Sequence, residues 1–105
     1  MGRSKEDLLD LPDDVVDDFG YLLGEIQLGR DIPCAAMSSI GSGAMEIWVD
    51  TGDTFRIFYV AKFPEALYVL HCFQKKSKKG IATPKRDLEM GESRYKEMQK
   101  FRSLL

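Results

Sequence analysis

Apolar side chains recur every three or four positions in the first third of the chain. This spacing over residues 12–29 predicts an amphipathic helix that begins at Pro12 and ends at Gly29. A shorter helix is predicted before it, from Ser4 to near Leu11, because Ser4 and the acids that follow it resemble a capping box. The apolar stripe of the longer helix consists of Val15, Val16, Phe19, Leu22, Leu23 and Ile26.

Three strands are predicted from runs of β-branched and aromatic residues in the middle of the chain. They cover residues 45–50, 54–60 and 66–74, and a hairpin turn at 51–53 joins the first two. The stretch before them, residues 30–44, is rich in Gly, Ser and Ala and is expected to be a loop.

A last helix is predicted over residues 84–102, with Thr83 as its N-cap and Pro84 at its first position. Gly91 lies inside this helix and is expected to lower the stability of the helix by about 1 kcal/mol relative to Ala. Four apolar side chains of this helix are expected to face the sheet: Leu88, Tyr95, Met98 and Phe101.

The order of these elements defines the expected fold class. Helices, then strands, then a helix predict an α+β fold, in which two N-terminal helices pack on a small antiparallel sheet of three to four strands, followed by a C-terminal helix. With 105 residues, the whole chain, 1–105, is expected to form a single domain.

Positive and negative charges are separated along the chain, although the net charge is only −2. Residues 1–53 carry three Lys or Arg and twelve Asp or Glu, whereas residues 54–105 carry twelve and five. Such an asymmetry between halves is typical of contact with nucleic acid or with a charged partner. Because nucleic-acid-binding domains are usually basic overall, the separation predicts a single binding face at the basic end.

Neither cysteine is expected to form a disulfide or to bind a metal. Cys34 and Cys72 do not form a Cys-x-x-Cys motif, and the single histidine, His71, lies inside an apolar run. The chain has no apolar stretch of membrane length and no recognisable targeting segment. We therefore expect a protein of the reducing cytoplasm that makes no membrane contact.

Arg56 is the polar exception in the predicted strand 54–60. Alternation along a strand places it on the face opposite to Phe55 and Ile57. Two interpretations follow from this position. The first is a structural ion pair with an acid such as Glu46 on the neighbouring strand. The second is a guanidinium fork that grips a phosphate, with a geometry that lysine cannot reproduce.

Six basic residues are concentrated where the third predicted strand ends and the last helix begins. They are Lys75, Lys76, Lys78, Lys79, Lys85 and Arg86. Cations at a helix N-terminus oppose the helix dipole, and the free N–H groups there already favour anions. The segment therefore predicts a phosphate-binding site, with a solvated surface run as the alternative. Repulsion lowers the pKa of crowded lysines, so one of them is a candidate general acid or base. His71 is a weaker candidate, since a lone histidine in an apolar strand is more often structural.

With these residues, the chain resembles the RelE/HigB superfamily of bacterial toxins, in particular its phage-derived HigB-like branch. The most specific part is an aromatic-Arg-aliphatic-x-Tyr strand, read here as FRIFYV. A Leu-His-x-Phe-x-Lys-Lys strand end and a Thr-Pro helix start follow it. The family's second helix resembles LPDDVVDDFGYLLGEIQLG, and its entry into the sheet resembles GSGAMEI, so the similarity extends over nearly the whole chain.

The resemblance implies the toxin of a type II toxin–antitoxin pair, which cleaves mRNA on the ribosome without a metal or cofactor. It implies a helical pair on one face of the sheet and an opposite face open to RNA. It also implies that a ribose 2′-hydroxyl is activated and attacks the adjacent phosphate in line. The catalytic residues would be Arg56, which steadies the phosphate, and Lys75, Lys76 and Lys78, without a decision as to which lysine is acid or base. The same residues would bind RNA together with Lys79, Lys85 and Arg86.

Two departures from the family pattern bear on these expectations. Many members carry basic residues on the strand before the arginine strand, but residues 45–50 contain no Lys or Arg. The catalytic set is then smaller or shifted, and the alternative is a non-catalytic RNA-binding or protein-interaction module that keeps the toxin fold. Trp48 and Phe58 are candidates to stack on bases in either case. Members also usually begin with a short strand, whereas the first helix here starts near Ser4, so a sheet edge is expected to be uncovered.

The implied partners are the ribosome, mRNA and a helix-turn-helix antitoxin. The antitoxin would either wrap the basic face or dock on the acidic helix, and a homo-oligomer remains a further alternative. The acidic residues, which would repel RNA, are Asp10, Asp13, Asp14, Asp17 and Asp18. They are expected to lie away from Arg56.

Overall fold

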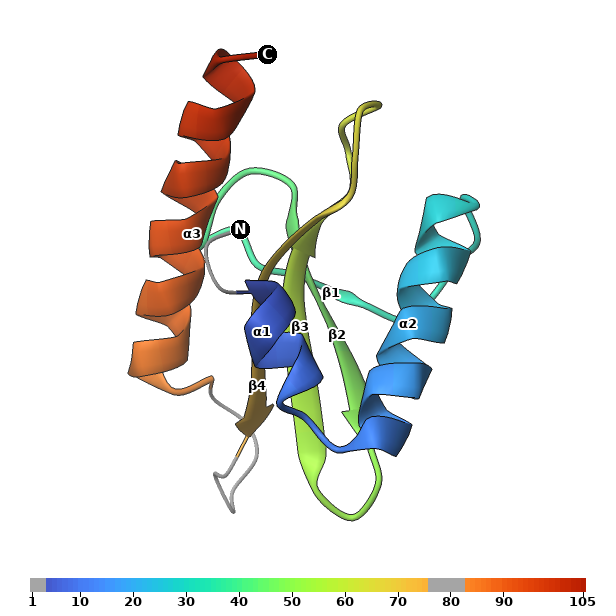
Figure 1. Ribbon diagram of the computed structural model, residues 1–105. Helices are drawn as coiled ribbons and strands as arrows, with labels where there is room; N and C mark the ends of the chain where they lie inside the picture. Colours follow the sequence, from blue (N-terminus) through green and yellow to red (C-terminus); the bar gives the residue numbers. More distant parts are fainter. Residues whose placement is uncertain (1–3, 76–82) are drawn as a thin grey trace.

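The computed structural model describes residues 4–75 and 83–105, and its elements follow the predicted order of helices, strands and a last helix (Figure 1). The helices are α1 (Ser4–Leu9), α2 (Asp13–Gln27) and α3 (Lys85–Ser103), and the strands are β1 (Ala35–Ala36), β2 (Ala44–Asp50), β3 (Thr54–Val60) and β4 (Tyr68–Lys75). The predicted basic residues Lys76, Lys78 and Lys79 lie outside the described residues.

Both long helices begin one residue later than predicted. Pro12 and Pro84 have extended ψ angles of 145° and 140°, which places them at the N-cap rather than at the first helical position. Neither helix has a side-chain cap, so the prediction of Thr83 as an N-cap is wrong. Proline still starts both helices, because its fixed φ directs the chain into the first turn. Gly29, with a φ of 78°, confirms the predicted end of α2.

The strands follow the prediction closely, apart from their ends. The expected loop 30–44 contains the two-residue strand β1, which pairs with Met45 and Glu46 of β2, and this was not predicted. Two alanines that follow Pro33 and Cys34 carry no alternation that distinguishes a strand from a loop. The predicted hairpin turn is confirmed, with Gly52 at a φ of 99°.

The four strands form one antiparallel sheet in the order β1-β2-β3-β4. Helices α1 and α2 pack on one face, where their apolar side chains meet Ile47, Ile57 and Cys72. Helix α3 packs on the other face, against Phe58 and Leu70. The sheet therefore lies between α2 and α3, and α1 lies over β4 (Figure 1). This arrangement confirms the predicted α+β fold.

A register shift in β4 increases the number of side chains that reach α3. Phe58 pairs with His71 and Tyr59 with Val69, so that Leu70 is an extra residue. Gly91 of α3 lies against Phe58, since a Cβ there would be 2.9 Å from the Phe58 ring. Of the four predicted sheet-facing side chains, Tyr95 and Met98 are buried and Leu88 packs against the same core, but Phe101 is 44% exposed.

None of the helices in the described part of the chain has the length and apolar character that a bilayer crossing requires.

Candidate nucleic-acid interface

Three neighbouring strands place Trp48, Arg56 and Phe73 in one row across the sheet. Arg56 is directly opposite Trp48 of β2 and Phe73 of β4 in the register. Because alternate residues of a strand share a face, this row lies on the same face as Phe58 and faces away from α2. Arg56 and Trp48 do not belong to the core that contacts α3, and both remain partly exposed. The expected RNA face is therefore covered by α3 only in part.

An ion pair with Glu46 holds the Arg56 side chain. The Arg56 Nη1 donates to Glu46 Oε1 over 2.5 Å. The glutamate side chain is only 5% exposed and the arginine side chain 20% exposed. The structural interpretation of Arg56, an ion pair with Glu46, is thereby confirmed. It does not exclude the phosphate-binding interpretation, because the guanidinium has five N–H donors.

The ion pair leaves polar atoms of both partners without a hydrogen bond. Within the described residues, Glu46 Oε2 and Arg56 Nε are buried and have no hydrogen-bond partner. A buried polar atom without a partner costs free energy of about 1–3 kcal/mol. A buried polar group without a partner in a native structure calls for an explanation, and a catalytic role is one of those known. This carboxylate oxygen and this N–H keep unused hydrogen-bonding capacity, although both atoms are buried.

Lys75 adds a second cation next to the ion pair. It is the last residue of β4, pairs with Thr54 in the register and is 7% exposed. Burial lowers the pKa of the Lys75 ammonium, and the nearby Arg56 charge lowers it further, while Glu46 opposes the shift. A lowered lysine pKa was predicted from the sequence, but from repulsion between neighbouring lysines rather than from burial. The structure brings Arg56, Glu46 and Lys75 together; Lys85 and Arg86 are exposed in the first turn of α3.

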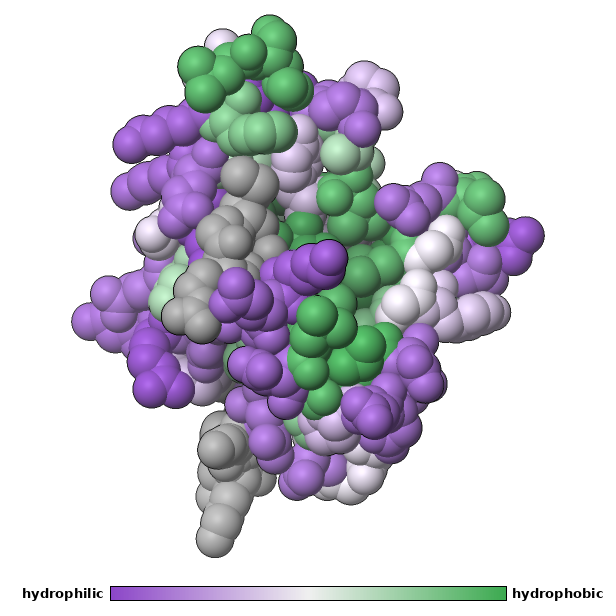
Figure 2. All heavy atoms as spheres, in the orientation of Figure 1, coloured by the Kyte–Doolittle hydropathy of each residue, from purple (hydrophilic) through white to green (hydrophobic). Residues whose placement is uncertain are grey.

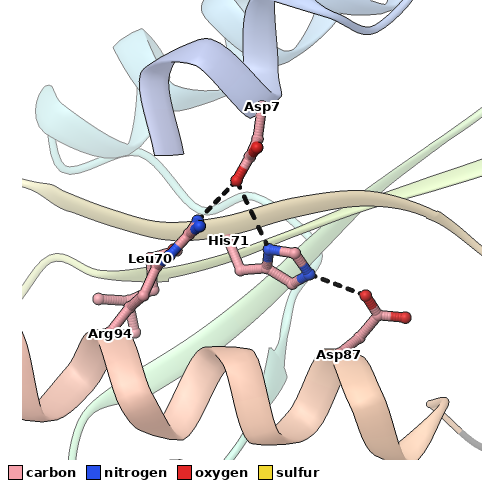
Figure 3. A network of polar contacts seen from close by, with 5 residues as sticks. All are labelled: Asp7, Leu70, His71, Asp87 and Arg94. Atoms are coloured by element: carbon pink, nitrogen blue, oxygen red, sulfur yellow. Dashed lines mark hydrogen bonds and ion pairs between the residues drawn. The ribbon is translucent and has the colours of Figure 1, made fainter. Parts of the chain in front are cut away.

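His71 belongs to a separate network that connects three elements (Figure 3). Its Nε2 is 2.8 Å from Asp87 Oδ1 of α3, and its Nδ1 is 3.9 Å from Asp7 Oδ2 of α1. Arg94 donates to the same Asp7 oxygen over 2.6 Å and to the Leu70 carbonyl over 3.2 Å. The His71 ring also stacks on Phe73 at 5.1 Å. The histidine thus ties α1 and α3 to β4, which agrees with the structural interpretation.

The acidic helix lies on the opposite side of the sheet from Arg56. Val15 and Phe19 of α2 are buried against Ile47 and Ile57, whose side chains point away from the Arg56 face. The acidic side chains of this region are exposed: Asp10, Asp13, Asp14, Asp17 and Asp18. The predicted separation of acidic and basic poles is therefore consistent with the packing.

Glu46 is the site residue whose burial the sequence pattern did not indicate. Its position on the strand next to Arg56 indicated an ion-pair partner, but not a buried carboxylate with a second, unbonded oxygen. Burial depends on the packing of distant segments, which a local pattern does not contain.

In the described ranges, 4–75 and 83–105, no group of three or more His, Cys, Asp and Glu is placed to hold a metal ion.

Helices on both sides of a four-stranded antiparallel sheet define a small α+β protein, in which Arg56, Glu46 and Lys75 lie close together on one face of the sheet. The family model of the phage-derived protein Gp49-like family matches residues 6–96, so the chain belongs to that family. It is a toxin family of the RelE/HigB type, associated with toxin–antitoxin pairs. No curated protein and no solved structure is found to match the chain.

Proposed function

We propose that this protein is the toxin of a type II toxin–antitoxin pair and cleaves mRNA on the ribosome. The observation that carries the proposal is the Arg56–Glu46 ion pair beside Lys75 on the partly exposed sheet face. Two cations and one carboxylate with an unbonded oxygen are the groups that RNA cleavage by its own 2′-hydroxyl requires.

The proposed chemistry assigns one role to each of the three side chains. Glu46 Oε2 accepts the proton of the ribose 2′-hydroxyl, whose oxygen attacks the adjacent phosphorus. The bond from phosphorus to the 5′-oxygen breaks in line, and the Lys75 ammonium donates a proton to this leaving oxygen. Arg56 binds the non-bridging phosphate oxygens as their negative charge grows. The products are a 2′,3′-cyclic phosphate and a free 5′-hydroxyl.

The lowered pKa of Lys75 supports its role as the acid. A general acid works best when its pKa lies near the working pH, and the Lys75 pKa is shifted downward toward that range. Trp48 would stack on a base next to the bound phosphate, and its position opposite Arg56 and its partial exposure support this role. Lys76, Lys78, Lys79, Lys85 and Arg86 would extend the phosphate contacts along the RNA.

The orientation on the ribosome, the partners, the cellular compartment and the branch of the superfamily belong to the same proposal. The exposed acids of α2 lie away from Arg56, which supports a ribosome-bound orientation with only one face toward RNA. The partners would be the ribosome, mRNA and a helix-turn-helix antitoxin, and the protein would act in the cytoplasm. Within the toxin superfamily, we assign the chain to the HigB-like branch on the strand motif around Arg56.

Mapping of mRNA 5′ ends tests the proposal. A reporter mRNA is translated with purified ribosomes, with and without the protein, and new ends are read by primer extension. We expect codon-phased ends that carry a 5′-hydroxyl and appear only when ribosomes are present. The Arg56→Ala variant should lower the cleavage rate by about 10²–10³-fold. Wild-type cleavage that needs no ribosome would contradict the ribosome-dependent part of the proposal.

Arg30→Ala is a matched control for Arg56→Ala. Arg30 is also paired with a glutamate, Glu25, at 2.8 Å, but its side chain is 63% exposed and lies at the end of α2. Its loss should leave cleavage unchanged. A lysine at position 56 separates charge from geometry, and it should rescue RNA binding more than cleavage. Equal cleavage by Arg56→Ala and the wild type would overturn the site assignment.

A non-catalytic RNA-binding or protein-interaction module is the second candidate function. The observation that favours it is Glu46, which neutralises Arg56, together with the absence of Lys and Arg from β2. In this case the protein binds RNA with a salt-dependent affinity and no new mRNA ends appear.

A further inference from the structure

Phe73 lies between the His71 network and the proposed RNA site. His71, Phe73 and Lys75 are alternate residues of β4 and therefore share one face of the sheet. Phe73 is also directly opposite Arg56 in the register. The three residues of β4 are each exposed by 9% or less. A buried aromatic ring thus separates a structural network on one side from two cations on the other.

Contacts from three elements hold the Phe73 ring in place. It stacks on the His71 ring at 5.1 Å, with an angle of 14° between the two planes. The His71 ring is itself fixed, because its Nε2 is 2.8 Å from Asp87 Oδ1 of α3 (Figure 3). Phe58 of β3 adds a second ring contact to Phe73 at 5.2 Å. The position of Phe73 is therefore determined by β3, β4 and α3 together.

Phe73 closes the edge of its core, whereas the core on the other face of the sheet is more open. On the α2 side, apolar side chains reach the surface between α1 and α2 (Figure 2), and Leu8 and Leu22 are only partly buried. Phe73 is the last apolar residue of β4 on its own face, next to the charged side chains, yet it is 7% exposed. The apolar edge beside Arg56 and Lys75 is therefore largely closed to water.

The side chain of Lys75 reaches back toward this closed edge. Lys75 pairs with Thr54, which places it one row beyond Arg56 and two rows beyond Glu46. Burial is the largest cause of the lowered pKa of Lys75, but the charges of Arg56 and Glu46 also act on it. To come near both charges, the lysine side chain has to run along the position of Phe73. On the same face of β4, the Phe73 ring is thus the apolar group next to the lysine.

Other charges on the elements that pack on this face are either engaged or exposed. Asp87 and Arg94 of α3 and Asp7 of α1 belong to the His71 network. The exposed groups, whose charges water screens, are Asp50 of β2 and Lys85 and Arg86 of α3. The charge state of Lys75 therefore depends mainly on its own burial and on the neighbouring ion pair.

We propose that Phe73 is a positioning residue of this site: its ring excludes water from the Lys75 ammonium and keeps the ammonium beside the ion pair of Arg56. Phe73 acts through Lys75 and makes no contact with RNA itself. During cleavage, the dry wall would hold the lysine in the state from which it releases its proton to the 5′-oxygen. This catalytic part rests on the proposed function, whereas the effect of Phe73 on Lys75 does not.

A titration of Lys75 in the free protein tests this inference. Protein with isotopically labelled lysine is followed by NMR as a function of pH, and the Lys75 signal is the one that the Lys75→Arg variant lacks. Phe73→Ala admits water to the ammonium and should raise the pKa of Lys75 toward the ordinary lysine value. Phe73→Leu keeps part of the apolar wall, so it should cause a smaller rise. It carries the test if the alanine variant does not fold.

Tyr68→Ala is the matched control for Phe73→Ala, and Tyr68→Leu for Phe73→Leu. Tyr68 is an aromatic residue of the same strand and the same core and is also 7% exposed, but it lies at the end of β4 opposite to Lys75. Its loss should destabilise the protein and leave the Lys75 titration unchanged. An unchanged Lys75 titration in the Phe73 variants would overturn the inference. An equal shift in the Tyr68 variants would also overturn it, since it would indicate a general loosening of the core.

The pH dependence of mRNA cleavage separates this inference from the proposed function. With Lys75 as the acid, the rate falls as the pH rises through the pKa of Lys75, so Phe73→Ala should move this alkaline limb to higher pH. A limb that stays in place although the Lys75 titration has shifted would overturn the catalytic part. A wild type that cleaves no mRNA, with the expected shift in the titration, would contradict the proposed function and still support the effect of Phe73 on Lys75.

Discussion

Arg56 and Glu46 form a part-buried ion pair in which the carboxylate is more deeply buried than the guanidinium. The donor and acceptor are 2.5 Å apart, and Glu46 keeps a second oxygen that has no hydrogen bond within the described residues. Because Arg56 contacts only one oxygen of this carboxylate, the second oxygen is buried without a hydrogen bond, which costs stability. The pair therefore links stability and the proposed chemistry at one place.

Substitution of Glu46 by Gln should separate the structural role of Glu46 from its proposed role as the general base. The amide keeps the shape and can still accept from Arg56, but it cannot take a proton. We expect the cleavage rate to fall by about 10²–10⁴-fold, which is typical of the loss of a general base. Single-turnover cleavage on ribosomes measures this loss. Asp50→Asn, at an exposed position of the same strand, should have no effect. Cleavage by Glu46→Gln at the wild-type rate would limit Glu46 to a structural role.

Replacement of His71 by Ala should destabilise the fold. It removes the 2.8 Å contact with Asp87 and leaves that carboxylate 8% exposed without its partner. Removal of one partner of a buried hydrogen bond leaves the other unsatisfied, which costs about 1–3 kcal/mol and more for a charged group. Urea unfolding followed by circular dichroism measures the change in the free energy of unfolding. Lys96→Ala, on the exposed side of α3, is the control and should change it by less than about 0.5 kcal/mol. A loss below about 1 kcal/mol for His71→Ala would show that this network contributes little.

The same substitution, Gly to Ala, should have opposite effects in α2 and α3. At Gly24 a new Cβ meets nothing within 4 Å, so Ala should raise the free energy of unfolding by about 0.5–1 kcal/mol through its helix propensity. At Gly91 the new Cβ would lie 2.9 Å from both Ile40 and the buried Phe58 ring. The ring has little room to move, so Ala there should lower stability by about 1–3 kcal/mol. Thermal unfolding of both variants measures the difference, and a stabilised Gly91→Ala variant would show that Phe58 repacks easily.

The ion pair between Glu65 and Arg102 should make stability depend on pH only under acidic conditions. The hydrogen bond from Arg102 lowers the pKa of Glu65 from 4.5 to about 2. Because the unfolded carboxyl takes up its proton first as the pH falls, the stabilising effect is complete above pH 4.5 and is lost as the pH falls toward about 2. The difference in unfolding free energy between the wild type and Glu65→Gln, measured as a function of pH, should shrink in this window. A difference that stays constant over the whole window would contradict the predicted shift.

Sequence patterns located most of the fold. The helical spacing of α2 and the alternation of β2 and β3 predicted these elements to within two residues, because both periods are local and each buries one face. The basic end of β4 and the position of Arg56 on the face away from Ile57 followed from the same alternation. Charge separation between the two halves also followed from the sequence, since residues near in sequence stay near in helices and hairpins.

The tertiary structure decided which polar residues form pairs and which side chains are buried. The contact between Arg94 and Asp7 joins residues 87 positions apart, and no local pattern contains such a pair. The same is true of the burial of Glu46 and of Lys75, which depends on side chains from other segments. The extra residue Leu70 in β4 and the close approach of Gly91 to Phe58 place α3 on part of the Arg56 face. The sequence by itself thus determined which residues are presented on which face, whereas their ion pairs, burial and pKa shifts arise only when distant segments pack together and exclude water.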